Sequence, residues 1–187
     1  EIMPSLVGSE MCIRDRCGVA HVPADRQKYG LILSMSLADN LALQTYYEKP
    51  LSKHGFLQKN EMIKKAERLV NGFDIRAANL MIPAGDLSGG NQQKAIIARE
   101  LDRNADLIIV FQPTRGLDVG AIEYIHEQLL KQREAGKAVL LVSYELDEIL
   151  KLSDRIAVIH NGQISGTVLP ADTNERELGL LMTGAVR

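Results

Sequence analysis

A serine followed directly by two glycines, and then by an uninterrupted helical stretch, constrains this chain more than any other feature. Ser88 precedes Gly89 and Gly90, and the residues from 89 to 102 have the composition of a helix. Serine is a favoured cap for the first turn of a helix, and glycines leave the backbone bare enough for a phosphate to approach. Because a helix N-terminus presents free amide groups and a positive dipole end, this stretch is suited to bind an anion.

Apolar runs alternate with amphipathic stretches along the rest of the chain. The run at 107–111 is continuously apolar, as is typical of a parallel strand buried on both faces, and 138–143 repeats it. The segment 57–73 carries an apolar stripe with lysines and glutamates opposite, which predicts a helix. The expected strands lie at 18–22, 107–111, 138–143, 155–160 and 163–168, and the expected helices at 57–73, 89–102, 119–135 and 145–152.

This alternation predicts an α/β fold, a mostly parallel sheet flanked by helices. Asn161 and Gly162 form a strong hairpin signal between the last two expected strands. At 187 residues the chain has room for one domain with a sizeable core.

Composition excludes several function classes. The net charge is −2 without a basic stretch, which gives no electrostatic case for binding nucleic acid. No apolar run approaches the roughly 20 residues that span a bilayer, so we expect membrane association only through a partner protein. Cys12 and Cys17 lack metal-ligand spacing and fit a reducing cytosol, and the four histidines are scattered, so we expect no metal site.

Several short segments, in the same order as in the family, resemble the motifs of ABC-type ATPases. Segment 87–94 matches the signature motif, 112–118 looks like the end of Walker B running into the D-loop, and 143–146 sits where the H-loop follows the next strand. Segment 162–164 resembles the turn that closes the cassette. Segment 23–26 resembles the second cassette of tandem-cassette sugar and nucleoside importers.

The resemblance covers about residues 18–184 and implies a partial ABC-type P-loop NTPase cassette with a helical signature subdomain. We therefore expect a partial nucleotide-binding domain at 17–184 and a short tail at 185–187. In this family the signature closes over ATP held by a partner cassette, and the D-loop crosses the same interface. The resemblance thus assigns ATP contact to the matching positions, Ser88, Gly89, Gly90, Asn91 and Asp118.

The motifs that would serve a nucleotide of this domain's own are altered or missing. No Gly-x-x-x-x-Gly-Lys-[Ser/Thr] run occurs anywhere, so there is no phosphate loop. The family's strand ends in Asp-Glu, which hold Mg²⁺ and polarise the attacking water, but Phe111 and Gln112 stand there. Tyr144 replaces the H-loop histidine. Because losing a general base costs about 10²–10⁴ in rate, we expect no intact catalytic residue and a degenerate site.

Plainer structural roles compete with these assignments. Gln112 would serve as a polar strand end, Tyr144 as a residue packed at the strand edge, and Asp118 as the cap of the helix that follows it. Asp25 and Arg26 fit a local salt bridge or turn contact better than catalysis.

The first sixteen residues show no helical or strand period and join the recognisable region abruptly. They resemble translated sequencing-adapter DNA, which predicts a non-native leader at 1–16, and a disordered arm is the alternative. Since the family's Walker A lies upstream of residue 18, we expect that truncation removed it.

The function expected is that of an ABC importer ATPase that powers nucleoside uptake, with ATP and Mg²⁺ bound mainly by the partner cassette. The expected partners are the N-terminal cassette of the same polypeptide, transmembrane permease subunits near 30–43 and, indirectly, an extracytoplasmic substrate-binding protein. The expected location is the cytoplasmic face of the membrane. A simple-sugar importer and a non-catalytic regulatory cassette are alternatives. Neither the coiled-coil heptads of chromosome-structure ATPases nor the paired catalytic glutamates of translation-associated tandem cassettes are present.

Overall fold

The structure, a computed structural model, describes residues 18–184, so the predicted leader at 1–16 and tail at 185–187 lie outside the described residues. The chain divides into two compact units, residues 1–140 and 141–187, and each is described by itself.

The sheet of the first unit has three strands, of which β1 and β4 form a parallel pair. β1 (Val19–Val22) pairs with β4 (Leu107–Phe111) in parallel, from Val19 opposite Leu107 to Val22 opposite Val110. β5 (Ala138–Val142) follows on the other side of β4, so the strand order is β1-β4-β5. The predicted parallel sheet is confirmed.

Burial in this sheet differs from the sequence prediction at β5. The inner residues of β4, Ile108 and Val110, are fully buried, as the apolar run predicts. In β5, however, Ala138 is exposed and Leu140 has 53% of its surface exposed, so the prediction of a fully buried strand is wrong there. β5 is the outer strand of the described sheet, and its alternate side chains therefore keep one open face.

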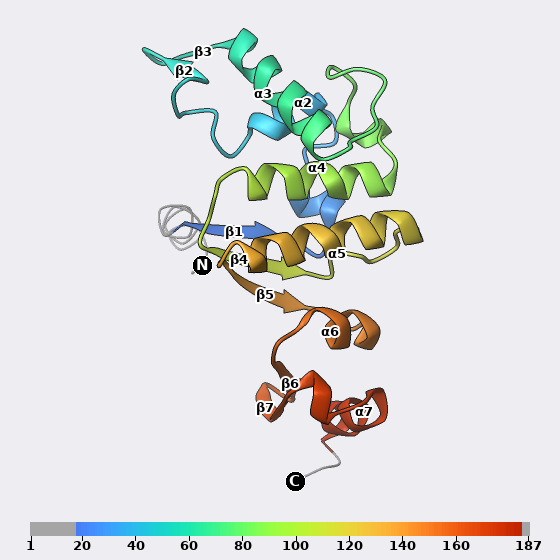
Figure 1. Ribbon diagram of the computed structural model, residues 1–187. Helices are drawn as coiled ribbons and strands as arrows, with labels where there is room; N and C mark the ends of the chain where they lie inside the picture. The colour runs from blue at the N-terminus through green and yellow to red at the C-terminus, as the bar shows by residue number, and fades with distance from the viewer. Residues whose placement is uncertain (1–17, 185–187) are drawn as a thin grey trace, which may run out of the picture. The chain divides into compact units, whose positions relative to one another are not determined.

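Helix α4 (Gly89–Leu101) is the central element of the first unit, between the sheet and the helices α2 (Leu37–Ala42) and α3 (Lys59–Gly72) (Figure 1). Every residue from Gln92 to Leu101 is buried, although the helix is not uniformly apolar. Two of its buried polar side chains donate to carbonyls of the neighbouring segments. The Arg99 guanidinium donates to the Gly30 carbonyl at 2.9 Å, and the Gln92 amide donates to the Ala84 carbonyl at 3.1 Å.

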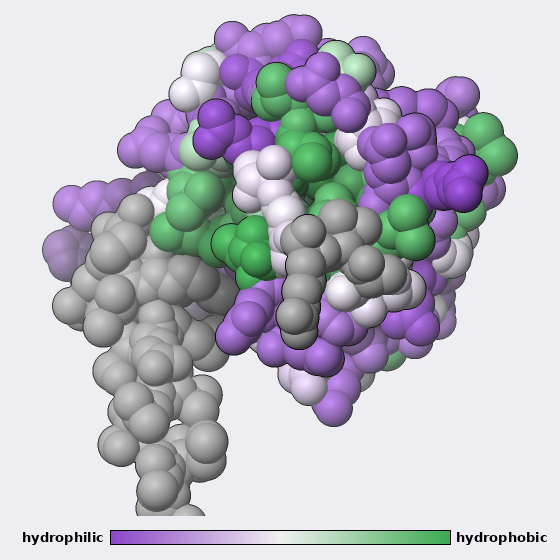
Figure 2. Space-filling model, turned by 90° about the horizontal axis from the view of Figure 1, so that it is seen from below, coloured by the Kyte–Doolittle hydropathy of each residue, from purple (hydrophilic) through white to green (hydrophobic). Residues whose placement is uncertain are grey.

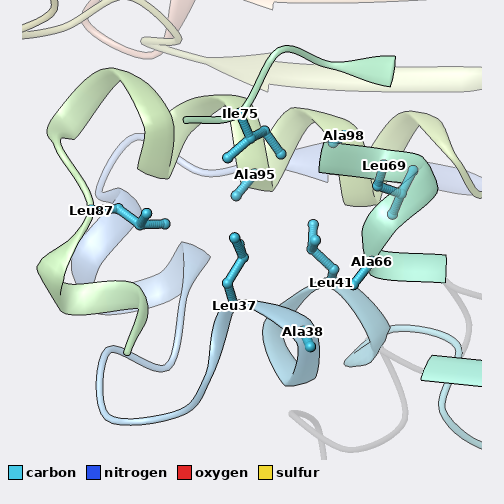
Figure 3. Close-up of a cluster of buried hydrophobic side chains, with 9 residues drawn as sticks. All are labelled: Leu37, Ala38, Leu41, Ala66, Leu69, Ile75, Leu87, Ala95 and Ala98. Atoms are coloured by element: carbon cyan, nitrogen blue, oxygen red, sulfur yellow. The ribbon is translucent and has the colours of Figure 1, made fainter. Parts of the chain in front are cut away.

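A shared apolar core joins α2, α3 and α4. The predicted stripe on α3 is confirmed, because Met62, Ala66 and Leu69 are all buried. Figure 3 shows how side chains from the three helices and the neighbouring loops point toward one another. This cluster consists of Leu37, Ala38, Leu41, Ala66, Leu69, Ile75, Leu87, Ala95 and Ala98.

Shorter elements complete the first unit. A single π-helical turn, η1 (Arg26–Gly30), contacts α4, and α5 (Val119–Glu134) also packs on α4. Between η1 and α5 in the sequence lie a short hairpin and a 3₁₀ turn. The hairpin pairs β2 (Ser52–Lys53) with β3 (Phe56–Leu57), and the 3₁₀ turn is η2 (Ala84–Asp86).

The second unit is a hairpin packed on a helix. β6 (Ile156–His160) and β7 (Gln163–Val168) are antiparallel, and both Asn161 and Gly162 have positive φ, as the predicted tight turn requires. α6 (Leu146–Leu152), η3 (Pro170–Asp172) and α7 (Glu175–Thr183) complete it.

One face of this hairpin is buried and the other is open. Ile156 and Val158 form a core with Leu178 of α7. The cross-strand pair Ile159 and Ile164 instead remains more than 60% exposed. The face of the molecule drawn in Figure 2 carries apolar side chains among hydrophilic ones. Within residues 18–184, no helix has the length and apolarity needed to cross a membrane.

Candidate functional site

The first turn of α4 is built around the side chain of Ser88. Ser88 is the N-cap, with an extended backbone at φ −60° and ψ 155°, and its hydroxyl accepts a bond from the Asn91 side-chain amide at 2.9 Å. The same hydroxyl accepts a longer bond, 3.4 Å, from the Asn91 backbone N–H. The side-chain oxygen of Asn91, Oδ1, in turn accepts from the Arg76 backbone N–H at 2.8 Å. These two bonds from Asn91 to Ser88 fix the turn while Ser88 stays exposed.

Both glycines of this turn allow a close approach by neighbouring elements. A Cβ atom at Gly89 would lie 2.8 Å from Nη2 of Arg26. A Cβ atom at Gly90 would lie 3.2 Å from Cβ of Ala121 and 3.5 Å from Oδ2 of Asp118. The sequence analysis assigned these glycines only to phosphate approach, but the structure shows that packing against η1 and α5 also demands them.

Asp118 occupies the N-cap of α5, immediately beside Gly90. Its Oδ1 accepts from the Ala121 backbone N–H at 2.9 Å. The capping role that the sequence analysis left open is therefore observed, and the other carboxylate oxygen faces the start of α4.

Arg26 is the residue of this region that sequence reasoning missed. It lies on η1, and its Nη1 donates to the backbone carbonyl of Arg115 at 3.0 Å. Asp25 does make the predicted turn contact, because its Oδ1 accepts from the backbone N–H groups of Gln27 and Lys28. The unusual segment 23–26 was the sequence signal that pointed here, but its partners lie more than 60 positions away.

The structure therefore brings the five predicted ATP-contacting residues together with Arg26. We call this group the α4 edge; it consists of Arg26, Ser88, Gly89, Gly90, Asn91 and Asp118. Its glycines, its serine hydroxyl and the positive end of α4 suit an anion.

One turn further along α4, Lys94 ties the helix to its surroundings. Its ammonium bonds to the carboxylate and to the carbonyl of Asp74, both at 2.9 Å, and lies 4.4 Å from the ring centre of Tyr124. The bond from Lys94 lowers the pKa of Asp74. Burial, followed by the charges of Asp74 and Glu127, raises the pKa of Tyr124 to about 12. Tyr124 is therefore neutral at physiological pH.

The three positions expected to be degenerate differ in their exposure. Phe111 ends β4 and is half-buried, whereas Gln112 is 6% exposed at φ 50°, and its Nε2 has no hydrogen-bond partner among the described residues. Tyr144 belongs to the second unit and is 69% exposed, so packing against the strand edge does not bury it.

These residues do not fit Mg²⁺. Phe111 offers no ligand atom, and Gln112 offers a neutral amide where Mg²⁺ favours carboxylate oxygens. Nowhere between residues 18 and 184 do three His, Cys, Asp or Glu side chains gather as metal ligands.

No family model matches the chain, but individual relatives do. It is 62% identical over 166 residues to the nucleoside import ATP-binding protein NupA of Lactococcus lactis subsp. cremoris, covering 89% of this chain and 33% of that protein. It is 57% identical over 170 residues to the guanosine import ATP-binding protein NupO of Bacillus subtilis, covering 91% of this chain and 33% of that protein. It is 45% identical to the glucose import ATP-binding protein TsgD13 of Haloferax volcanii, covering 89% of this chain and 31% of that protein. The chain thus spans about a third of the length of these relatives.

Among solved structures, the dimeric ATP-binding cassette MJ0796 bound to ADP and phosphate matches with a TM-score of 0.71 at 25% sequence identity. The match covers 89% of this chain and 68% of that one. The fold is therefore that of an ABC-type ATPase cassette. The curated relatives are ATP-binding proteins of nucleoside and sugar import, and the chain is homologous to them over most of its own length.

Proposed function

We propose that this chain is the part of an ABC importer ATPase that presents a signature motif to ATP held by a partner cassette. Its α4 edge would contact the terminal phosphate of that ATP and so couple hydrolysis to nucleoside uptake. The partner cassette is the N-terminal one of the same natural polypeptide, which makes this chain part of the second cassette.

The observation that carries this proposal is the assembly of the α4 edge. Ser88 and Gly90 come from α4 and Asp118 from the start of α5, yet they meet at one point of the surface. Ser88 is exposed there, although the rest of its helix is deeply buried. A buried helix that opens only at a capped, glycine-rich first turn suits an anion delivered from outside the domain.

The chain's own nucleotide site is proposed to be degenerate. Phe111 and Gln112 would not hold Mg²⁺ or accept a proton from water, and the exposed Tyr144 carries no imidazole. ATP and Mg²⁺ would therefore be bound mainly by the partner.

Identity favours nucleosides over sugars as the cargo. The two nucleoside-import relatives are 62% and 57% identical to this chain, whereas the glucose-import relative is 45% identical. Uptake of labelled guanosine, adenosine and ribose by cells carrying the complete transporter tests this choice. Uptake of ribose alone would select the simple-sugar alternative.

The proposed partners follow from the import role. Transmembrane permease subunits would dock near residues 30–43, where Ile32 is 42% exposed, and an extracytoplasmic substrate-binding protein would act indirectly. The chain would then work at the cytoplasmic face of the membrane, held there by the permease.

A matched pair of substitutions at Ser88 tests the central claim in the complete transporter. Asparagine and aspartate both cap helices as well as serine does, so Ser88→Asn and Ser88→Asp should both preserve α4. They differ by one negative charge placed where the phosphate would bind. We expect Ser88→Asp to abolish ATP turnover and uptake, with Ser88→Asn retaining much more of both. Equal activity of the two variants would exclude a phosphate at this turn.

Gln112→Glu tests the degenerate site. Restoring the carboxylate alone should add little ATPase activity, because Phe111 still supplies no ligand for Mg²⁺. A large gain would overturn the degenerate assignment. If neither Ser88 nor Gln112 variants alter turnover, the regulatory, non-catalytic alternative is favoured.

A further inference from the structure

We propose that Arg26 is a positioning residue that clamps the loop before α5 to the first turn of α4. By this clamp, Ser88 and Asp118 would move toward the partner's nucleotide as one rigid unit. The consequence for ATP turnover rests on the proposed function, whereas the clamp itself concerns only this chain.

The turn η1, which carries Arg26, is closed by its own hydrogen bonds and attached to α4. The turn η1 closes with a bond from the Leu31 backbone N–H to the Arg26 carbonyl at 2.9 Å, and Asp25 caps its start. Gly30, at its end, accepts from Arg99 of α4 at 2.9 Å. A Cβ atom at Gly30 would lie only 2.4 Å from Cδ1 of Ile96, so the Gly30 backbone packs closely against the Ile96 side chain of α4. The turn that carries Arg26 is therefore fixed to α4.

The Arg26 side chain contacts both the loop before α5 and the first turn of α4. One guanidinium nitrogen, Nη1, donates to the Arg115 carbonyl at 3.0 Å, in the loop that ends at Asp118. The other, Nη2, lies against the bare backbone of Gly89. The guanidinium thus spans from α4 to the loop, and its rigid planar fork allows both contacts at once.

The positive charge of Arg26 is unfavourable beside the N-terminus of α4. A cation beside a helix N-terminus opposes the helix dipole, so Arg26 is not placed there to stabilise α4. Its Nε is also buried and has no hydrogen-bond partner among residues 18–184. An unfavourable position with an unpaired donor is typical of a residue retained for function rather than stability.

The loop is buried at its start, at Gln112, Pro113 and Thr114, and exposed at Arg115 and Gly116. Its turn is closed by backbone bonds from Arg115 to Gln112 at 3.4 Å and from Leu117 to Thr114 at 3.2 Å, and Gly116 has a φ of 68°. Both bonds are longer than the most common N–H···O distance of about 2.9–3.0 Å. The bond from Arg26 at 3.0 Å is the shorter one and ties the loop to another element.

Hydrogen exchange on the full chain without nucleotide measures the clamp directly. Arg26→Ala should speed exchange of amides in 113–121 roughly 2- to 10-fold, the factor that one hydrogen bond contributes to a local opening equilibrium. Peptides from α3 should not change. Arg68→Ala removes an exposed arginine of α3, which pairs with Asp102 at 2.8 Å, and is the matched control that should leave 113–121 unchanged.

A second variant reaches the same contact from the other side. Gly89→Ala places a methyl group where Nη2 lies, so it should displace the guanidinium and also speed exchange in 113–121. In the Arg26→Ala background the same methyl group has nothing to displace and should add no further increase. If Arg26→Ala also exposes the α3 peptides, it has unfolded the unit, and Gly89→Ala alone then decides the test. Unchanged exchange in 113–121, or full additivity of the two substitutions, would overturn the clamp.

In the complete transporter, Arg26→Ala should lower kcat for ATP roughly 10- to 100-fold, the scale on which displaced positioning groups act. ATP affinity should not change, because the partner's own phosphate loop holds the nucleotide. If Ser88→Asp abolishes turnover and Arg26→Ala spares it, only the clamp's functional role fails. If Ser88→Asp has no effect, the proposed function fails, and hydrogen exchange still decides the clamp.

Discussion

Replacing Asp118 separates its two roles, because asparagine and alanine remove different parts of it. Oδ1 of Asp118 accepts from the Ala121 backbone N–H at 2.9 Å, and the Asp118 carbonyl accepts the first helical bond, from Ile122, at 3.0 Å. Asparagine retains a capping oxygen of the same reach and loses only the charge. Alanine loses both the cap and the charge.

The structure gives the expected size of each loss. An N-cap hydrogen bond contributes roughly 0.5–2 kcal/mol, and a negative charge in the first turn contributes about 0.3–1 kcal/mol more. Asp118→Ala should therefore lower the free energy of unfolding by about 1–3 kcal/mol, and Asp118→Asn by no more than about 1 kcal/mol. In a chain of this size, each kcal/mol shifts Tm by roughly 2–4 °C.

Urea unfolding followed by circular dichroism measures both variants, and ATP turnover of the complete transporter measures the functional role. If Asp118 acts at the cassette interface, Asp118→Asn should lose activity while keeping most of its stability. Asn174→Ala removes the cap of α7, where the Asn174 side chain accepts from Glu177 at 3.1 Å, and should cost stability without activity. An Asp118→Asn protein as unstable as Asp118→Ala would refute the capping geometry.

Three further predictions concern stability, each measured by equilibrium unfolding. Tyr124→Phe removes a buried hydroxyl that has no hydrogen-bond partner in the described part of the chain and should stabilise the fold by up to about 1–3 kcal/mol. Gly30→Ala places a methyl group against Ile96 inside a packed contact and should destabilise it by about 1–3 kcal/mol. Burial raises the pKa of Asp102, but hydrogen bonds from Lys65 and a neighbouring arginine outweigh that effect, so the net pKa is lowered. Its contribution is thus complete above about pH 5, is lost as pH falls through the lowered pKa, and should vanish in Asp102→Asn.

Sequence patterns were most informative where the signal is local. The apolar run of β4, the stripe on α3 and the Asn161–Gly162 turn all appear as predicted, because periodicity and turn chemistry act over a few residues. Helices α2 and α7 were missed although both begin with a side-chain N-cap followed three residues later by an acidic residue. Ser36 caps α2 with Asp39 three residues on, and Asn174 does the same for α7.

Long-range packing accounts for what local patterns could not predict. The exposure of Leu140 in β5 depends on which elements lie beside that strand, and its apolar run contains no such information. The contact of Arg26 with Gly89 joins positions 63 apart in the chain, and the bond to Arg115 spans 89. An arginine in a polar turn looks solvated until the fold places a helix N-terminus next to it.

The close packing of the two glycines changes how mutations at the α4 edge should be interpreted. A larger residue at Gly89 would displace Arg26, and one at Gly90 would press on Ala121, before any nucleotide is considered. Loss of activity in such variants therefore does not prove a phosphate contact. Ser88 is the better probe, since it is exposed and its capping bond survives replacement by asparagine or aspartate. If Ser88→Asp lowers ATP turnover, Ser88→Asn does not, and neither changes the stability of the fold, the first turn of α4 contacts an anion. Glycine substitutions cannot give this evidence.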